Sequence, residues 1–280
     1  MERLTVRAGK HVLAYRDAGP RDGQVVLLLH GLASDADTWD RAVDPLAAQG
    51  LRVIALDLVG HGESETPAQG GYLLEDFAAS IAAFLDAMGL DRVVAGGHSF
   101  GGAIAVEFAA RYRDRVSHLV LVSAGGLGRE VHPALRAAAL PIAPVVLRAM
   151  TAPGMRRIYR RPTLHRALRL TPENLVNLRR AARALGSPAK QAAFFASLRG
   201  VIEPGGQRGS FIEMRTMPLD LPTLLVWSAR DGVIPVGHAR AAHAALPNSS
   251  LVVFEDGKHE PHRSNAGPFA EAVAAFLASH

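Results

Sequence analysis

The sequence predicts an α/β fold in which helices cover a mostly parallel β-sheet and a helical cap is inserted. Short apolar runs alternate with segments of helical periodicity at both ends of the chain, as in successive strand–helix units. Residues 25–29 are apolar throughout, which is typical of a strand buried on both faces. This alternation stops between residues 125 and 220, where prolines interrupt stretches rich in Ala, Leu and Arg. These residues therefore indicate the cap.

The first half of the chain begins with two alternating runs around Gly9-Lys10, which predict a hairpin. The strands expected here span residues 4–7, 11–16, 25–29, 53–56, 92–95 and 116–122. The helices expected between them span residues 38–49, 73–88 and 103–112.

The sheet resumes after the cap. Strands are expected at residues 223–227 and 251–254, and helices at residues 237–245 and 269–279. Within the cap, residues 203–209 form a glycine-rich loop without strand periodicity. The predicted organisation is a core of residues 1–124 and 221–280 with a cap or lid of residues 125–220.

Composition bounds the function more weakly than the motifs do. The 280 residues include no cysteine, which excludes disulfides and cysteine-ligated metal. The charged N-terminal residues lack the apolar run of a signal peptide, and no run approaches the ~20 apolar residues of a membrane span. A cytoplasmic protein is therefore the expectation.

The positive net charge of +5 is concentrated in the cap. Residues 126–200 contain 13 arginines and one lysine against two glutamates, whereas acidic residues are in excess elsewhere. Three interpretations are open: a solvated helical face, attraction of an anionic substrate, and peripheral contact with an anionic membrane surface. No nucleic-acid partner is expected, because no nucleic-acid-binding motif accompanies the charge.

Ser99 is the candidate nucleophile. It lies in Gly96-Gly97-His98-Ser99-Phe100-Gly101-Gly102, between a strand-like and a helix-like run. The glycines Gly97 and Gly101 fit a strand–turn–helix elbow, whose crowded backbone leaves no room for flanking Cβ atoms. Because a serine hydroxyl is a weak nucleophile by itself, the elbow predicts an acid and a histidine base further along the chain.

The expected base is His259, in a loop just after the last buried strand, where α/β sheets place their active sites. Its rival, His262, lies beyond Pro261 and suits a structural or rim role. The expected acid is Asp231, in the loop after the strand that ends at Trp227. An Asp-Gly pair is also a common turn, but the order Ser, Asp, His favours the catalytic role.

Backbone N–H groups are needed to stabilise an oxyanion. The segment His30-Gly31-Leu32 follows a buried strand, and the N–H of Leu32 is expected to converge with that of Phe100. Gly31 permits the close approach, whereas His30 and His98 suit supporting roles. Asp35 and Asp37 suggest metal ligands, but without a third nearby ligand they are interpreted as turn and helix-cap residues. Neither a metal nor a cofactor is expected.

These motifs together resemble the α/β-hydrolase superfamily. The matching segments are His30-Gly31, Asp57 to Ser64, Gly97 to Gly101, Asp231 to Pro235 and Gly257 to His262. The resemblance implies an eight-stranded sheet with a cap after the sixth strand, and the triad Ser99, Asp231 and His259 with oxyanion donors Leu32 and Phe100. Lys258 stands where the family usually has glycine, and Ser264-Asn265 where it commonly has glutamate. Serine at the elbow argues against the dehalogenase and epoxide hydrolase branches, which use aspartate.

The function expected from these residues is hydrolysis of a small-molecule carboxylic ester through an acyl-enzyme. The substrate is expected to be anionic or to carry an apolar acyl chain, and the His-Gly motif is similar to family members that accept medium or longer chains. Apolar cap residues are expected to wall the acyl pocket: Leu135, Leu140, Ile142, Val145, Val146, Leu147 and Met150. The alternatives on the same fold are a C–C bond hydrolase, a lactonase and a cofactor-free perhydrolase or haloperoxidase. Alternatives of another kind are a ligand receptor with little turnover and a lipase that docks on membranes through its cap.

Overall fold

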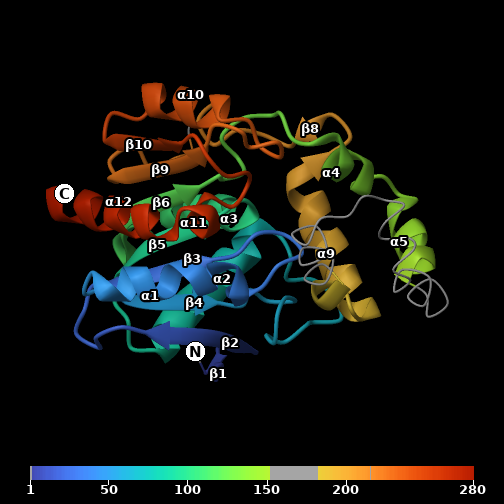
Figure 1. Cartoon of the computed structure of the whole chain (residues 1–280). Helices are drawn as coiled ribbons and strands as arrows, with labels where there is room; N and C mark the ends of the chain where they lie inside the picture. The colour runs from blue at the N-terminus through green and yellow to red at the C-terminus, as the bar shows by residue number, and fades with distance from the viewer. Residues whose placement is uncertain (1, 152–181, 215) are drawn as a thin grey trace, which may run out of the picture.

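An eight-stranded sheet forms the centre of the molecule in a computed structural model that describes residues 2–151, 182–214 and 216–280 (Figure 1). The strand order is β1-β2-β4-β3-β5-β6-β9-β10. The bounds are β1 Leu4–Ala8, β2 His11–Ala18, β3 Val25–Leu29, β4 Arg52–Leu56, β5 Val93–His98, β6 Val116–Val122, β9 Thr223–Ser228 and β10 Ser249–Phe254. Strand β2 pairs antiparallel with β1 and β4, and all other pairs in this sheet are parallel.

Helices cover both faces of this sheet because alternate strand residues point to opposite sides. In β3, Val26 and Leu28 face the helices α1 (Asp40–Ala48) and α12 (Ala266–Ser279). Leu27 and Leu29 face the larger cluster, which contains α2 (Leu74–Ala87), α3 (Phe100–Arg111) and α10 (Gly237–Ala245). The central strands β3, β4, β5 and β9 are thus buried on both faces, as their continuous apolar runs predict, whereas the edge strand β10 is half-buried.

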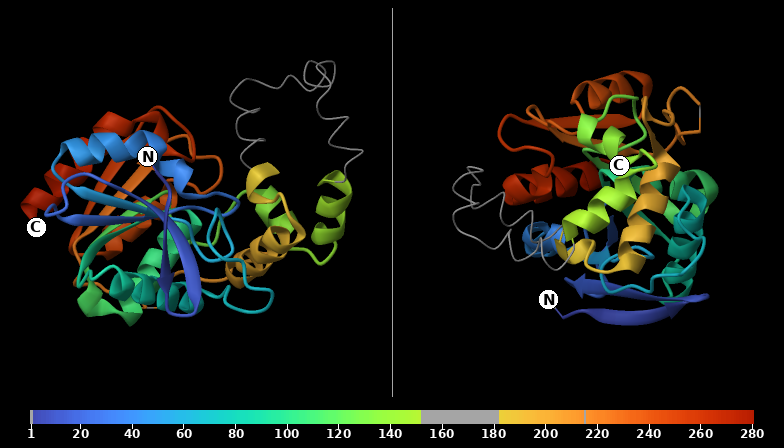
Figure 2. Two further views of the ribbon diagram at one scale, coloured as in Figure 1. Left: turned by 90° about the horizontal axis from the view of Figure 1, so that it is seen from below. Right: turned by 90° about the vertical axis from the view of Figure 1, so that its right-hand side faces the viewer.

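The segment after β6 leaves the sheet and forms a separate layer at one end of it (Figures 1 and 2). Its described elements are α4 Pro133–Ala138, α5 Ala143–Thr151, α9 Pro188–Val201, β7 Ile202–Glu203 and β8 Gly206–Gln207. Helix α9 buries Ala193, Phe194 and Leu198 in the same apolar cluster as α2 and α3. This segment therefore shares a continuous core with the rest of the molecule.

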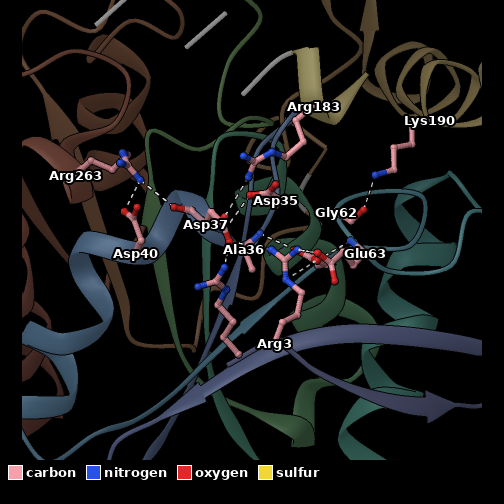
Figure 3. A network of polar contacts seen from close by, with 12 residues as sticks. Arg3, Asp35, Ala36, Asp37, Asp40, Gly62, Glu63, Arg183, Lys190 and Arg263 are labelled. Atoms are coloured by element: carbon pink, nitrogen blue, oxygen red, sulfur yellow. Dashed lines mark hydrogen bonds and ion pairs between the residues drawn. The ribbon is translucent and has the colours of Figure 1, made fainter. Parts of the chain in front are cut away.

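Polar contacts also tie α9 and its preceding residues to loops of the core (Figure 3). The Lys190 Nζ donates a hydrogen bond to the carbonyl of Gly62 over 2.7 Å. A guanidinium nitrogen of Arg183 lies 3.7 Å from one carboxylate oxygen of Asp37. The other oxygen of this carboxylate accepts a hydrogen bond from Arg3 over 2.8 Å. The N-terminus, the loop after β3 and the cap therefore meet in one charged network.

The structure confirms the predicted fold class, and the segment predicted to form a cap begins after the sixth strand. Among the boundaries that differ from the prediction are the two at the elbow, where β5 continues to His98 and α3 begins at Phe100. The cause is the glycine-rich elbow, whose residues have low intrinsic preference for strand or helix although the tertiary fold places them in both. The two-residue strands β7 and β8, too short to leave a periodic signal, lie within and beside the predicted loop. None of the described helices is long and apolar enough to span a membrane.

Candidate active site

Ser99 occupies a sharp turn between β5 and α3. Its backbone angles, φ 54° and ψ −116°, lie where residues with a Cβ atom are strained. The turn is held in place from both sides, since the Ser99 N–H donates to the carbonyl of Val122 over 3.0 Å. The Ser99 carbonyl accepts hydrogen bonds from the N–H groups of Gly102 and Gly125. The surrounding chain therefore maintains the strain at this one residue.

The flanking glycines are required by close backbone packing. A Cβ atom on Gly97 would lie 2.1 Å from the carbonyl oxygen of Gly101. A Cβ atom on Gly101 would lie 2.3 Å from the carbonyl oxygen of Leu29, on the neighbouring strand. Neither neighbour is a flexible side chain that could move aside. Any larger residue would displace the elbow itself.

His259 and Asp231 form a direct pair. The His259 Nδ1 lies 2.9 Å from Oδ2 and 3.1 Å from Oδ1 of Asp231. Because a carboxylate only accepts, Nδ1 carries the proton and Nε2 is left with a free lone pair. Asp231 also accepts the N–H groups of Val233 and Ile234, over 2.8 and 3.0 Å. The tautomer and orientation of the imidazole are thereby fixed.

The electrostatics of Asp231 favour its charged form. Burial of the carboxyl opposes ionisation, but the hydrogen bond from His259 and those from the two backbone N–H groups outweigh it. The pKa of Asp231 is therefore below its ordinary value. Asp231 is therefore a carboxylate at neutral pH.

The elbow and the His259 loop are connected through His98. Its Nε2 lies 2.8 Å from the carbonyl oxygen of His259, and the two imidazole rings are 4.7 Å apart. The hydroxyl of Ser99 itself has no hydrogen bond to any residue in the described part of the chain. Catalytic hydrogen bonds often tighten only when substrate is bound.

The loop after β3 supplies open backbone donors beside Ser99. His30 organises this loop, since its Nδ1 donates to the carbonyl of Gly31 over 2.8 Å and its Nε2 accepts the Leu58 N–H over 3.1 Å. A Cβ atom on Gly31 would lie 3.3 Å from that of Ser99, so the loop passes directly over the elbow. Among the described residues, neither the N–H of Leu32 nor that of Phe100 has a hydrogen-bond partner.

A cavity of about 200 Å³ opens onto Ser99, Leu32 and Phe100. Its walls are mainly apolar and come from the loops after β6 and β9, from α4 and from the chain after α9. The principal apolar residues are Val131, Leu135, Ile202, Phe211, Met214 and Ile234. Of the described lining residues one is ionic, the exposed Arg208. The site thus combines a serine, two open N–H groups and an apolar pocket.

The sequence model of the α/β hydrolase fold family matches residues 24–266. The chain belongs to the α/β hydrolase fold family. The match runs from just before β3 to the start of α12 and so includes every candidate site residue.

Individual relatives of this hydrolase differ in chemistry. An uncharacterized protein of Mycobacterium tuberculosis is 34% identical over 275 residues, which cover 94% of this chain and 77% of the relative. A 2-hydroxy-6-oxononadienedioate/2-hydroxy-6-oxononatrienedioate hydrolase of Pseudomonas putida is 28% identical over 95% of this chain and 91% of its own. The solved structure of a thermophilic esterase from Thermogutta terrifontis superposes with a TM-score of 0.74 at 25% identity, covering 100% of this chain and 99% of that one.

The hydrolase brings most of the predicted site residues together. Leu32, Ser99 and Phe100 line one cavity, and Asp231 is paired with His259. The rival histidine, His262, is fully buried against Trp39, which fits the first of the two roles expected for it, structural or at the rim. Asp35 caps the short helix η1 (Ala36–Trp39) by accepting the Asp37 N–H, and no metal-binding cluster occurs among the residues described.

The prediction of which residues wall the pocket was largely wrong. Of the apolar cap residues expected there, Leu135 lines the cavity, whereas Leu140, Ile142, Val145 and Val146 are exposed to solvent. The walls come instead from loop residues such as Phe211, which carry no periodic signal. The side chain of Met150 lies outside the described residues, as do eight of the 13 arginines of residues 126–200.

Ser264 and Asn265, which stand where the family commonly has glutamate, form hydrogen bonds within the loop that carries His259. Gly257 has φ +99°, and a Cβ atom there would lie 2.3 Å from the hydroxyl of Ser264. Ser264 donates to the carbonyl of Glu260 and Asn265 to that of Asp256, each over 3.2 Å. These short polar side chains thus cross-link the loop.

Proposed function

We propose that this protein is a serine hydrolase that cleaves carboxylic esters through an acyl-enzyme. The observation that carries the proposal is the His259–Asp231 pair, tied through His98 to the strained Ser99 elbow, which lines an apolar cavity. A strained serine, an imidazole of fixed tautomer and open N–H groups beside the serine are together what acyl transfer requires.

In the proposed mechanism the Ser99 hydroxyl attacks the ester carbonyl and passes its proton to Nε2 of His259. Asp231 holds the opposite ring N–H and stabilises the imidazolium that forms. The N–H groups of Leu32 and Phe100 bind the developing oxyanion, and each such donor typically contributes roughly 3 kcal/mol. His259 then protonates the leaving alcohol. In the second half of the reaction a water molecule gives a proton to His259 and attacks the acyl-enzyme, the bond to Ser99 Oγ breaks, and His259 returns the proton to Ser99 as the acid leaves.

The cavity favours an acyl chain of medium length. Its volume of about 200 Å³ gives room for an acyl chain of several carbon atoms. Because the described walls are mainly apolar, each buried methylene of such a chain would contribute about 0.8 kcal/mol to binding.

A second candidate is hydrolysis of a C–C bond, favoured by the similarity to the P. putida dienedioate hydrolase over 95% of this chain. It would use the same serine, histidine and aspartate. A dicarboxylate substrate needs cationic partners, and the described cavity offers the exposed Arg208. The apolar character of the remaining described walls favours the ester.

A substrate panel separates these candidates. It would comprise p-nitrophenyl esters from acetate to dodecanoate, the 2-hydroxy-6-oxononadienedioate that appears in the name of the P. putida relative, and Ser99→Ala as the blank. The proposal predicts repeated turnover with the highest kcat/KM near hexanoate, and none with the blank. Preferential cleavage of the dienedioate would establish the second candidate instead. Labelling of Ser99 without turnover would indicate a ligand receptor.

The domain organisation and cellular location that we propose for this enzyme are those predicted from its sequence. We propose a hydrolase core of residues 1–124 and 221–280, a cap of residues 125–220, a cytoplasmic location, and no cofactor or metal in the reaction. Peripheral membrane contact through the arginine-rich cap is tested by sedimentation with anionic and neutral vesicles. Binding that requires the anionic lipid and weakens with salt supports it, and equal sedimentation with both vesicles refutes it.

A further inference from the structure

A group of buried aromatic and imidazole rings lies directly behind His259. The ring of His98 is 4.7 Å from that of His259 and 4.8 Å from that of His262. The centroid of the Trp39 ring lies 4.2 Å from that of His262 and 6.5 Å from that of His98. His98 itself is 5% exposed. The rings behind the proposed base are therefore packed too closely to rotate independently.

His98 makes one polar contact within this group, and that contact is to the main chain of His259. Its Nε2 lies 2.8 Å from the His259 carbonyl oxygen. A carbonyl only accepts, so the proton of His98 is on Nε2 and Nδ1 is unprotonated. Among the described residues Nδ1 has no hydrogen-bond partner, and it faces Gly31, where an added Cβ would lie 3.2 Å away.

The protonation state of His98 keeps this donor neutral. Burial, together with the neighbouring His259, lowers the pKa of His98 to about 3. Across the range in which a histidine base operates, His98 therefore presents one N–H and no charge. It cannot compete with His259 for a proton at those pH values.

His259 is consequently held at two places by two different elements. Asp231 fixes its ring, and His98 fixes its carbonyl from the residue immediately before the nucleophile. We infer that His98 is a positioning residue, whose N–H sets the distance between the base and Ser99 by locking the His259 main chain to the elbow. This inference rests on the proposed function, because it assigns a reason for a contact within the proposed site.

The test compares His98→Gln with His98→Asn. The amide nitrogen of glutamine reaches the position of Nε2, whereas that of asparagine reaches only the position of Nδ1. His98→Asn is expected to lower kcat about 10²-fold with KM unchanged, since displacement of a catalytic group by about 1 Å costs that much. His98→Gln is expected to recover most of the loss.

The matched control is His118→Asn. His118 is buried on the adjacent strand β6, and neither of its ring nitrogens has a hydrogen-bond partner among the described residues. This control is expected to retain the wild-type kcat. Thermal melts of all variants show whether each is folded before its kinetics are compared.

The outcomes distinguish this inference from the proposed function. Absence of ester turnover by the wild-type enzyme refutes the function itself. Normal turnover by the wild-type enzyme and by His98→Asn refutes the positioning role alone. A loss that appears in KM, or that glutamine fails to restore, also overturns the inference, because either result indicates a packing role.

Discussion

Lowering the pH from 7 to 5 is expected to remove a large part of the folding free energy of this hydrolase. Five buried histidines, His30, His61, His98, His118 and His262, have pKa values below the ordinary value, chiefly because burial disfavours their charged forms. In the unfolded chain a histidine titrates near pH 6.5. Below that pH the unfolded state binds protons that the folded state does not, so stability falls as the pH falls.

The magnitude follows from the two histidines with resolved values. The pKa is about 4 for His61 and about 3 for His98, so both remain uncharged at pH 5 when folded. Unfolding at pH 5 then gains about 2 kcal/mol from each, or about 4 kcal/mol together, at roughly 1.4 kcal/mol per pH unit below 6.5. His30, His118 and His262 act in the same direction. Typical domains have only ~5–15 kcal/mol of stability in total.

Urea unfolding at pH 7, 6 and 5 measures this loss through the fluorescence of the buried Trp39 and Trp227. A matched variant isolates one group. His61→Asn keeps a donor for the carbonyl of Val59, which His61 Nδ1 contacts over 3.0 Å, and removes the titration. Below pH 6 the free energy of unfolding of this variant is expected to fall less steeply than that of the wild type. The two slopes should differ by about 1.4 kcal/mol per pH unit. The exposed His243→Asn serves as the control. Equal stability at pH 7 and 5, or equal slopes for His61→Asn and wild type, would refute the reasoning.

Three substitutions test the proposed site and its geometry. Asp231→Asn is expected to lower kcat about 10⁴-fold, because the imidazole loses the carboxylate that fixes its tautomer; steady-state kinetics measure this, and a loss below tenfold would argue against the assignment. Gly101→Ala is expected to cost at least about 3 kcal/mol of unfolding free energy, because its Cβ meets the Leu29 carbonyl, whereas Gly267→Ala, with no atom within 4 Å, costs nothing; urea melts compare the two. Ser99→Gly is expected to be more stable than Ser99→Ala by about 1–3 kcal/mol, because glycine relieves the strain at φ 54°; equal melting temperatures would show that the elbow stores no strain.

The sequence was sufficient for those parts of the fold and site that leave local signals. Buried parallel strands leave continuous apolar runs, and the glycines around Ser99 mark a backbone too crowded for Cβ atoms. Asp231 and His259 were located because each follows a recognisable strand. In each case the physical requirement acts within a few residues of the chain.

The remaining features depend on contacts between distant residues. His98 and the carbonyl of His259 are 161 residues apart, and no pattern around either residue reveals their hydrogen bond. The cavity walls include Ile202 and Phe211, which belong to a short hairpin and a loop without periodicity. The exposure of Val145 was likewise hidden, because an amphipathic helix does not reveal which surface covers its apolar side.

The central claim, that Ser99 carries the acyl group during turnover, is tested most directly by trapping that intermediate. The wild-type enzyme would be mixed with p-nitrophenyl hexanoate, quenched with acid within milliseconds, digested and examined by mass spectrometry. We expect a hexanoyl group on the peptide that contains Ser99 and no such group in Ser99→Ala. In Asp231→Asn the amount of acyl-enzyme is expected to increase if the substitution slows deacylation more than acylation. Turnover that continues in Ser99→Ala, or an acyl group that appears on another residue, would contradict the central claim.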